Sequence, residues 1–345
     1  MRHLAPGLLS LIAIACAVAA CGDDEPATPG DSATNGDAGG PGPSGDDAGG
    51  SSSGDATVTA DGSSDAASGA CTGKTGASGN RIVDVTVGST KRSFDLHVPP
   101  TYDPSKGTPL VFVFHGYTMT AASIASASKF VSTADAHGMI VAFPTGLNSG
   151  FNAGECCGAS VTAKVDDLGF TRAMVSSISK DYCVDAKRVY STGFSNGGFM
   201  SYYLACEMAD TFAAVASVAG TLGVPPADCK PKRPISLLHI HGTGDLVVPY
   251  LGGGVGANRS VATSVEAFRT LDTCPAGDGA SVFAKDDVTC TQWACAAGTH
   301  VQHCAVTNGG HQWPGGEPLP YGGSPSPNLD ASEAIAKFFE AHPLP

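Results

Sequence analysis

Apolar and polar residues follow a regular order along the chain from residue 81 to the C-terminus. The runs 81–87 and 92–98 alternate apolar and polar positions on either side of a short polar turn, which predicts a β-hairpin. Further short apolar runs predict buried strands. These runs lie at 109–116, 139–144, 188–193, 212–220, 235–242 and 301–309.

Between the predicted strands, apolar residues recur every three or four positions, the spacing that places them on one face of a helix. In the segment 165–182 this stripe contains Phe170, Met174 and Ile178, and an aspartate precedes the first turn as a cap. Strands that alternate with helices predict one α/β domain, with a mostly parallel sheet and helices on both of its faces. The predicted helices are 120–138, 165–182, 196–210, 260–274 and 330–342.

The first 70 residues do not follow this pattern. Residues 1–20 carry Arg2 and a short apolar stretch, typical of an export signal. The ending Val-Ala-Ala-Cys resembles the lipobox of bacterial lipoproteins, which makes Cys21 a predicted lipidation site; ordinary cleavage and release into the medium is the alternative. Residues 21–70, rich in Gly, Ser and Asp, are expected to form a disordered linker that tethers a folded domain at 71–345.

Charge is unevenly distributed along the 345 residues, whose net charge is −13. Residues 23–70 contain ten acidic side chains and no basic one, which leaves 18 basic and 22 acidic side chains from residue 71 onward. A folded domain so close to neutrality lacks the basic surface that nucleic acids require, and the chain has no polybasic segment for anionic lipid. The predicted contact with a membrane is therefore through the lipid anchor alone.

Twelve cysteines are present, and ten remain once Cys16 and Cys21 are assigned to the N-terminal segment. An even number behind an export signal predicts disulfides, and the lack of any Cys-x-x-Cys pair argues against a zinc site. Cys156 and Cys157 are adjacent, and because a ring between neighbours is strained, each is expected to join a different partner. Four cysteines of the last third are expected to pair locally: Cys274, Cys290, Cys295 and Cys304.

Two segments match Gly-x-Ser-x-Gly, the pattern of the turn that exposes a nucleophilic serine. Residues 50–54 lie in the polar linker and show that a glycine-rich chain produces the pattern by chance. Residues 193–197, in contrast, follow a predicted strand and precede a predicted helix, which is the context that the chemistry requires. Ser195 is therefore the candidate nucleophile, and a glycine-rich turn without chemistry is the alternative.

A serine hydroxyl needs a neighbouring base, and the base needs a carboxylate to orient it. Asp245 follows the strand predicted at 235–242, and His311 follows the strand predicted at 301–309. The order serine, acid, histidine is one that catalytic triads use, and both residues come where loops gather at the carboxyl edge of a parallel sheet. Three other acids lie near helix ends and are interpreted as caps: Asp210, Asp228 and Asp272.

Two backbone N–H groups would bind the oxyanion that forms during acyl transfer. One belongs to Asn196, directly after the nucleophile, and the other to Tyr117, in the turn after the strand predicted at 109–116. Trp313 lies two residues past the candidate base. It either forms an aromatic wall for the substrate or packs the loop of that base.

Four further histidines lie on or beside predicted strands. His239 and His241 alternate on one strand, so that they share a face. They form either a metal-binding pair or, as we favour, a hydrogen-bonded pair that shapes the loop of Asp245. His300 and His303 flank the start of a strand and are expected at the surface.

Several motifs together resemble those of the secreted esterase family that contains feruloyl esterases and polyhydroxybutyrate depolymerase-like enzymes, within the α/β-hydrolase superfamily. The resemblance extends from about residue 81 to the C-terminus and rests on GFSNG, FHGYTMTAAS, FNAGECCGA, VDDLGF, LHIHGTGDLVVPY and GGHQWPGG. It implies the α/β-hydrolase fold, with Ser195 as nucleophile, His311 as base and Asp245 as its orienter. It also implies that Tyr117 and Asn196 supply the oxyanion N–H groups.

The resemblance and the motifs together predict an exported, lipid-anchored serine esterase that acts as a monomer and needs no cofactor or metal. The expected substrate is a hydroxycinnamoyl ester of plant polysaccharide. A polyhydroxybutyrate depolymerase or an acetyl-xylan esterase is the alternative with the same chemistry. The alternative of another class is a binding lipoprotein that kept the fold and lost the activity, and a serine-directed phosphonate probe distinguishes it from an enzyme.

Overall fold

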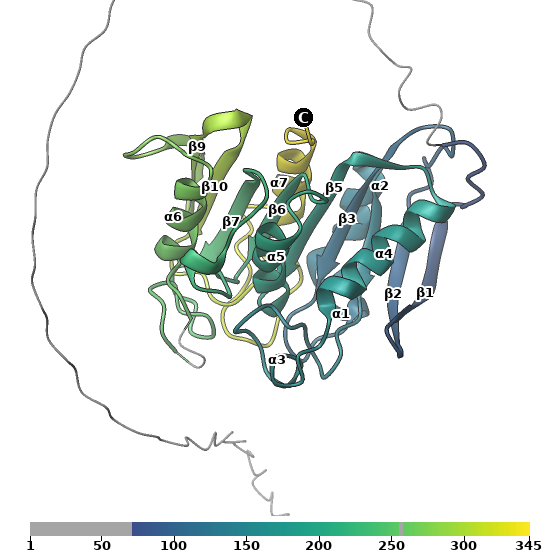
Figure 1. Cartoon of the computed structure of the whole chain (residues 1–345). Coiled ribbons are helices and arrows are strands. Elements are labelled where there is room, and N and C mark those ends of the chain that lie inside the picture. The colour runs from purple at the N-terminus through teal and green to yellow at the C-terminus, as the bar shows by residue number, and fades with distance from the viewer. Residues whose placement is uncertain (1–70, 255–257) are drawn as a thin grey trace, which may run out of the picture. The chain divides into compact units, whose positions relative to one another are not determined.

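The computed structural model describes residues 71–254 and 258–345; the predicted export signal, Cys21 and the predicted linker lie outside these residues. The described strands form one sheet in the order β1-β2-β4-β3-β5-β6-β7-β10-β9-β8 (Figure 1). They are β1 (Gly79–Val87), β2 (Thr90–Val98), β3 (Thr108–Phe114), β4 (Ile140–Pro144), β5 (Val184–Phe194), β6 (Ala214–Val218), β7 (Ser236–Gly242), β8 (Ala280–Lys285), β9 (Val288–Ala294) and β10 (His300–Val306).

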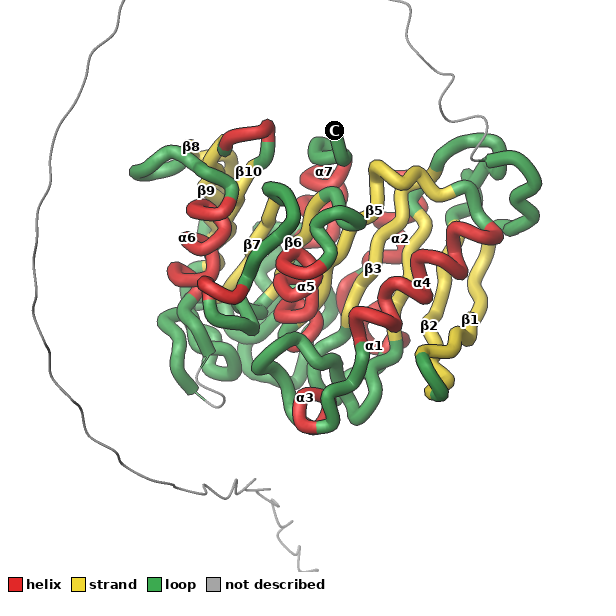
Figure 2. The backbone as a smooth tube through the Cα atoms, viewed as in Figure 1, coloured by secondary structure: helices red, strands yellow, loops and turns green. Residues whose placement is uncertain are grey.

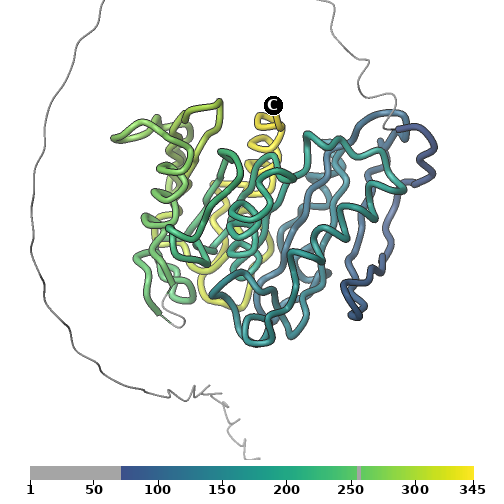
Figure 3. The backbone as a smooth tube through the Cα atoms, viewed as in Figure 1, coloured from purple at the N-terminus to yellow at the C-terminus, as the bar shows by residue number. Residues whose placement is uncertain are grey.

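The central strands of the sheet run parallel. β3 pairs with β4 and β5, and the parallel order continues through β6 and β7 to β10. Antiparallel pairs flank this part, with the β1–β2 hairpin on one side and β9 with β8 on the other. The predicted mostly parallel sheet is confirmed. The carboxyl ends of its parallel strands meet at one edge, the lower edge in Figure 3.

Helices cover both faces of the sheet, as predicted (Figure 2). Strand β3 shows why, because Phe112 and Phe114 face the core beneath α4, α5 and α6, whereas Val111 and Val113 face the core beneath α1, α2 and α7. Within the described residues, no helix is long and apolar enough to cross a membrane. The α-helices are α1 (Ala121–Ser128), α2 (Phe130–His137), α3 (Ala159–Thr162), α4 (Asp167–Asp181), α5 (Asn196–Glu207), α6 (Val261–Leu271) and α7 (Ala331–Glu340).

The prediction of one continuous helix at 120–138 is wrong. The structure divides it into α1 and α2 at Lys129, which adopts a φ of 57°. The backbone oxygen of Ser128 accepts a hydrogen bond from the hydroxyl of Ser332 at 2.6 Å, instead of continuing the helical ladder. The donor belongs to α7, so a tertiary contact supports the break.

The β8–β9 hairpin was not predicted, because its residues form no apolar run. All six residues of β8 are exposed, because this strand lies at the edge of the sheet. Two disulfides hold the neighbouring strand in place: Cys290–Cys304 joins β9 to β10, and Cys274–Cys295 joins the segment after α6 to the end of β9. The predicted local pairing of these four cysteines is confirmed.

The expectation that Cys156 and Cys157 join different partners is wrong, because the structure pairs them with each other. The remaining cysteines explain this outcome. Cys71 pairs with Cys183, and Cys206 pairs with Cys229. Together with the two disulfides near β9, these bonds use every other cysteine of the described residues, which leaves the adjacent pair only each other.

Candidate active site

Ser195 occupies a sharp turn between β5 and α5. Its φ of 53° and ψ of −118° are unusual for a residue with a side chain, and such strain is concentrated at functional sites. A Cβ on Gly193 would collide with the backbone of Gly197, and one on Gly197 would collide with the carbonyl of Phe114. Only glycines therefore allow the strand, the turn and the helix to approach so closely, and this packing gives the Gly-x-Ser-x-Gly pattern its physical reason.

Asp245 and His311 come together at the edge where the parallel strands end. Asp245 lies in the turn after β7 and His311 in the loop after β10, and His311 Nδ1 lies 2.6 Å from Asp245 Oδ2. The other carboxylate oxygen, Oδ1, accepts hydrogen bonds from the N–H groups of Val247 and Val248 at 2.8 and 2.9 Å. The carboxylate is thus fixed on both oxygens, and Nδ1 of the imidazole donates to it, which leaves Nε2 free to accept a proton.

The carboxylate of Asp245 stays ionised although its side chain is wholly buried. Burial acts to raise its pKa, but hydrogen bonds from His241 and His311, together with the positive charge these rings can carry, lower it. The lowering effects prevail, and the pKa of Asp245 lies well below its usual range. A permanently charged carboxylate behind an imidazole is the arrangement that stabilises an imidazolium.

Ser195 follows a residue that contacts this pair, and it makes no direct hydrogen bond to the pair. The ring of Phe194, the preceding residue, packs against the ring of His311 with centroids 4.7 Å apart. Within the described residues the hydroxyl of Ser195 makes no hydrogen bond, and such bonds are often long before substrate binds. The structure therefore brings Asp245 and His311 together directly, and it places Phe194, the residue before Ser195, in contact with His311.

The two predicted oxyanion donors flank Ser195. A Cβ built on Gly116 would lie 3.3 Å from the Cβ of Ser195, so the turn that carries Tyr117 borders the serine. Asn196 begins α5, where backbone N–H groups have no partner within the helix. In the described part of the chain, neither N–H donates a hydrogen bond to another backbone group.

His115 orients the peptide group that carries the Tyr117 N–H. Its Nε2 accepts a hydrogen bond from Gly146 N–H at 3.0 Å, so Nδ1 carries the proton and donates it to Gly116 O at 2.8 Å. Met119 N–H donates to the same oxygen at 3.0 Å. Because this oxygen and the Tyr117 N–H belong to one peptide group, holding the oxygen aims the N–H. Burial lowers the pKa of His115, which favours the neutral form that this arrangement needs.

The side chain of Asn196 holds a neighbouring loop that sequence reasoning did not assign to the site. Its Oδ1 accepts from Phe151 N–H at 2.7 Å, and its Nδ2 donates to Phe151 O at 3.0 Å. The ring of Tyr117 covers the same loop so closely that a Cβ on Gly150 or Gly158 would collide with it. The segment FNAGECCGA thus packs against both candidate oxyanion residues, Tyr117 and Asn196. The spacing of its residues in the sequence does not predict this contact.

Trp313 does not lie at a surface. Its side chain is wholly buried, and its Nε1 donates a hydrogen bond to the hydroxyl of Ser332 in α7 at 3.1 Å. Of the two roles that the sequence left open, this placement favours packing of the loop that carries His311. An aromatic wall formed by Trp313 does not agree with its burial.

Tyr321 lies near the candidate base and was missed by sequence reasoning. Its ring centroid is 5.6 Å from that of His311 and 6.2 Å from that of Phe194. It is partly exposed and comes from a loop rich in glycine and proline that shows no periodicity. Tyr117 is also partly exposed, with 38% of its surface accessible.

His239 and His241 form a hydrogen-bonded pair, with His239 Nε2 and His241 Nδ1 3.1 Å apart. This contact agrees with the favoured interpretation. Across residues 71–254 and 258–345, no group of three His, Cys, Asp or Glu side chains is arranged to hold a metal ion. The expectation of a surface position is wrong for His303, because its ring packs against that of His239 with centroids 5.4 Å apart; His300 is partly exposed.

Asp272 is the C-cap residue of α6, as interpreted, whereas Asp210 lies beyond Met208, the C-cap residue of α5, and caps no helix of the described residues. Asp210 forms an ion pair with Lys232, and Asp272 Oδ1 accepts from Ile235 N–H at 3.1 Å at the opposite edge of the sheet. The side chain of Asp272 is wholly buried, and this burial raises its pKa to about 6, against the lowering effects of its hydrogen bonds and of Arg233.

This shift predicts how Asp272 changes stability with pH. An unfolded aspartate has a pKa of about 3.9, so between about pH 4 and pH 6 the folded state binds more protons, and stability falls as the pH rises. Asp272→Asn, which resembles the protonated form, should raise the free energy of unfolding at pH 7.5 by about 1–3 kcal/mol and change it little at pH 4. Urea unfolding at the two pH values measures this difference, and an equal effect at both would contradict it.

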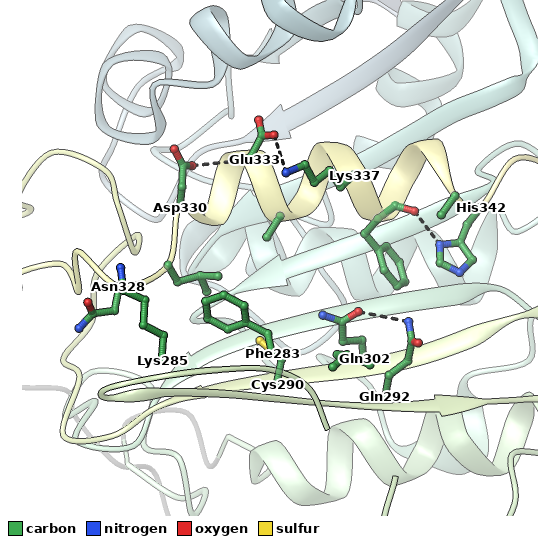
Figure 4. Close-up of a pocket in the computed structure, with 15 residues that line it drawn as sticks. Phe283, Lys285, Cys290, Gln292, Gln302, Asn328, Asp330, Glu333, Lys337 and His342 are labelled. Carbon is green, nitrogen blue, oxygen red and sulfur yellow. Dashed lines mark hydrogen bonds and ion pairs between the residues drawn. The ribbon is translucent and has the colours of Figure 1, made fainter. Parts of the chain in front are cut away.

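A groove of about 510 Å³ lies between strands β8, β9 and β10 and helix α7, and none of Ser195, Asp245 and His311 lines it (Figure 4). Its lining includes Phe283, Gln302 and His342 but none of the candidate catalytic residues. This groove is therefore separate from the contact between Asp245 and His311.

Comparisons with known proteins place the chain in a family. Residues 87–227 match the family described as "Putative esterase". The chain is 33% identical over 266 residues to "Putative esterase NocK" of Nocardia uniformis subsp. tsuyamanensis, which covers 69% of this chain and 75% of the relative. It is 32% identical over 257 residues to "Feruloyl esterase C" of Emericella nidulans, with 72% of this chain and 84% of the relative covered.

The chain therefore belongs to this esterase family, and it is a carboxylesterase, as predicted. Solved structures agree on the fold. "Acetyl xylan esterase from Aspergillus awamori" superposes with a TM-score of 0.53 at 14% identity, covering 76% of this chain and 99% of that one. A ferulic acid esterase from Anaeromyces mucronatus, solved with ferulic acid, superposes with a TM-score of 0.51 at 14% identity, covering 76% and 90%. The predicted α/β-hydrolase fold is confirmed.

Proposed function

We propose that this carboxylesterase uses Ser195, His311 and Asp245 as a catalytic triad. The observation that carries the proposal is the 2.6 Å contact between His311 Nδ1 and Asp245 Oδ2, beside the strained turn of Ser195. In this proposal Ser195 Oγ attacks the ester carbonyl while His311 Nε2 takes its proton. The N–H groups of Tyr117 and Asn196 bind the oxyanion of the tetrahedral intermediate.

The second half of the reaction returns the enzyme to its starting state. The imidazolium of His311 gives its proton to the leaving alcohol, and the C–O bond to that alcohol breaks, leaving Ser195 acylated. Water then attacks the acyl-enzyme with His311 again as base, and the carboxylic acid departs. Asp245 holds the imidazole in the required tautomer throughout and stabilises its charged form.

We propose hydroxycinnamoyl esters of plant polysaccharide as the substrate. The relative named feruloyl esterase C supports this class, and so do the two tyrosines beside the candidate centre, Tyr117 and Tyr321. A flat phenolic ring gains about 0.5–1.5 kcal/mol from pairing with an aromatic side chain beyond simple burial. The ring preference should therefore amount to roughly two- to tenfold in kcat/KM.

The substrate proposal is tested with a panel of esters. We expect kcat/KM for methyl ferulate to exceed that for a small aliphatic methyl ester, and Tyr321→Leu to reduce this ratio by roughly two- to tenfold. Tyr203→Leu, a partly exposed tyrosine of α5, is the matched control and should leave the ratio unchanged. Acetate release from acetyl-xylan, or clearing of polyhydroxybutyrate, without turnover of methyl ferulate would replace the proposed substrate with one of these.

We further propose that the protein is exported and held at the membrane, as a monomer, by a lipid on Cys21. The ending of the signal segment and the disulfides between ten cysteines of the described domain support export to an oxidising compartment. The native protein should then partition with membranes, and Cys21→Ser should release it or leave it unprocessed. Native protein found in the medium alone, beginning elsewhere than Cys21, would refute the anchor.

A further inference from the structure

A chain of buried hydrogen bonds runs from α5 through β7 to the candidate acid. Tyr202 Oη lies 2.8 Å from His239 Nδ1, and His239 Nε2 lies 3.1 Å from His241 Nδ1. His241 Nε2 in turn lies 3.3 Å from Asp245 Oδ2, the same oxygen that receives His311. All of these side chains are buried. Of these residues, the proposed mechanism uses only Asp245 and His311.

The direction of the hydrogen bonds follows from the acceptors at one end. His241 Nε2 also lies 2.9 Å from the carbonyl oxygen of Val248, so it faces two groups that can only accept. Nε2 therefore carries the proton, and Nδ1 of a neutral His241 accepts from His239 Nε2–H. Nδ1 of His239 then accepts from the hydroxyl of Tyr202. Every proton in the chain points toward Asp245.

Burial is the main reason that His239 and Tyr202 are uncharged at neutral pH. Burial lowers the pKa of His239 well below its usual value, and the nearby His241 and His303 act in the same direction. Burial raises the pKa of Tyr202 well above its usual value. His303 is paired with the hydroxyl of Tyr250, and its pKa is lowered to about 4, chiefly by burial.

The ring of Tyr250 also stands edge-on to that of His241, with centroids 5.9 Å apart. The titratable groups that face His241 are therefore His239, His303, Tyr250 and Asp245. At neutral pH, Asp245 is the charged member of this set.

We propose that His241 is a positioning residue of the triad, and that Tyr202 and His239 hold it in the tautomer that donates to Asp245. The inference rests on the proposed function, because it gives Asp245 Oδ2 a second side-chain donor beside His311. That donor restrains the carboxylate and withdraws negative charge from it. Both effects set how firmly the carboxylate binds the imidazolium of His311.

Removing the donor has two consequences that can be measured separately. Asp245 loses a restraint that aligns it with His311 while keeping its contact, which should lower kcat by roughly 10- to 100-fold with little change in KM, since small misplacements of catalytic groups are costly. The carboxylate also becomes more negative and stabilises protonated His311 more strongly. The acid limb of the kcat/KM profile should therefore move to higher pH, by roughly half a unit.

The experiment compares His241→Leu with His241→Gln in the full-length protein, using a p-nitrophenyl acetate assay that does not depend on the acyl preference. Leucine removes the donor, whereas the glutamine amide can place an N–H near the position of Nε2. We expect both effects in His241→Leu and recovery to within about fivefold of the wild type in His241→Gln. His300→Leu, whose ring pairs with His342 on another part of the fold, is the matched control and should change neither property.

A second measurement does not require turnover. The Nδ1–H proton of His311, in its short hydrogen bond to Asp245, should give a far-downfield proton NMR signal whose pH midpoint moves upward in His241→Leu and returns in His241→Gln. This signal tests the positioning role without any need for ester hydrolysis. A wild-type protein that does not hydrolyse the ester would count against the proposed function, but not against the positioning role of His241. An unchanged midpoint together with an unchanged kcat in His241→Leu would overturn the proposal.

A milder pair of variants covers the case in which His241→Leu does not fold. Tyr202→Phe removes only the hydroxyl that fixes the tautomer of His239, and Tyr203→Phe makes the same change at the next position of α5. We expect Tyr202→Phe to lower kcat by roughly two- to tenfold and to move the acid limb in the same direction as His241→Leu. Equal kcat and equal pH profiles for the two phenylalanine variants would show that the chain is structural packing without influence on the triad.

Discussion

Ser195→Ala is expected to lower kcat by about 10⁴- to 10⁶-fold while leaving KM largely unchanged. The hydroxyl is consumed in forming the acyl-enzyme, so its loss removes the covalent route and leaves binding and the oxyanion N–H groups in place. Steady-state kinetics with p-nitrophenyl acetate measure the loss. Labelling by a serine-directed phosphonate should disappear in the same variant, because the probe bonds to Ser195 Oγ.

The control for this experiment is Ser176→Ala, on the exposed side of α4, which makes the same chemical change away from the turn. It should keep both the activity and the labelling of the wild type. A Ser195→Ala protein that retains more than about a tenth of the activity would show that Ser195 is not the nucleophile. A wild-type protein that neither turns over esters nor reacts with the phosphonate would instead match a binding protein on the same fold.

Asp245→Asn should lower kcat by about 10³- to 10⁴-fold although it barely changes the shape of the side chain. The N–H groups of Val247 and Val248 will hold the asparagine oxygen in the place of Oδ1, which turns the NH₂ group toward His311. An NH₂ group donates, so His311 Nδ1 must accept, and the ring proton moves to Nε2. The base then faces the serine with a proton already in place.

Single-turnover kinetics should locate the defect of Asp245→Asn in acylation, where Nε2 must take the serine proton. Asp228→Asn, an exposed residue outside the site, is the matched control and should behave as the wild type. An Asp245→Asn variant within about tenfold of the wild type would mean that another group orients the base.

The fold could be predicted because buried parallel strands and amphipathic helices leave different periods in the sequence. The runs that became β3 and β7 are mainly apolar, since both of their faces are covered, and all seven residues of each strand are buried. The cap of α4 was equally local: Asp166 Oδ1 accepts from Gly169 N–H at 2.7 Å. The turn at Ser195 was predicted because backbone segments that pack closely require glycine, and the glycines at positions 193 and 197 appear in the sequence as Gly-x-Ser-x-Gly.

Features that depend on partners distant in the sequence were not predictable. The break between α1 and α2 involves a hydroxyl from α7, and the β8–β9 hairpin lies at an edge where burial imposes no pattern. Tyr321 reaches His311 from an irregular loop, and Trp313, two positions after the same histidine in sequence, is wholly buried in the core. Neighbouring positions in a loop thus differ in role, and nothing in their spacing distinguishes them.

The sequence by itself determined the α/β class, the esterase family, and the residues that carry the candidate chemistry, because each depends on local pattern or on short motifs. The tertiary structure alone decided which polar groups meet across those motifs. His241 and Asp245 are four residues apart, but Tyr202 and His311 come from other elements, and only the parallel arrangement of β5, β7 and β10 assembles them. A hydrogen bond forms only when the separation of two polar atoms is correct to within a few tenths of an ångström. The periodicity of a sequence does not encode such separations.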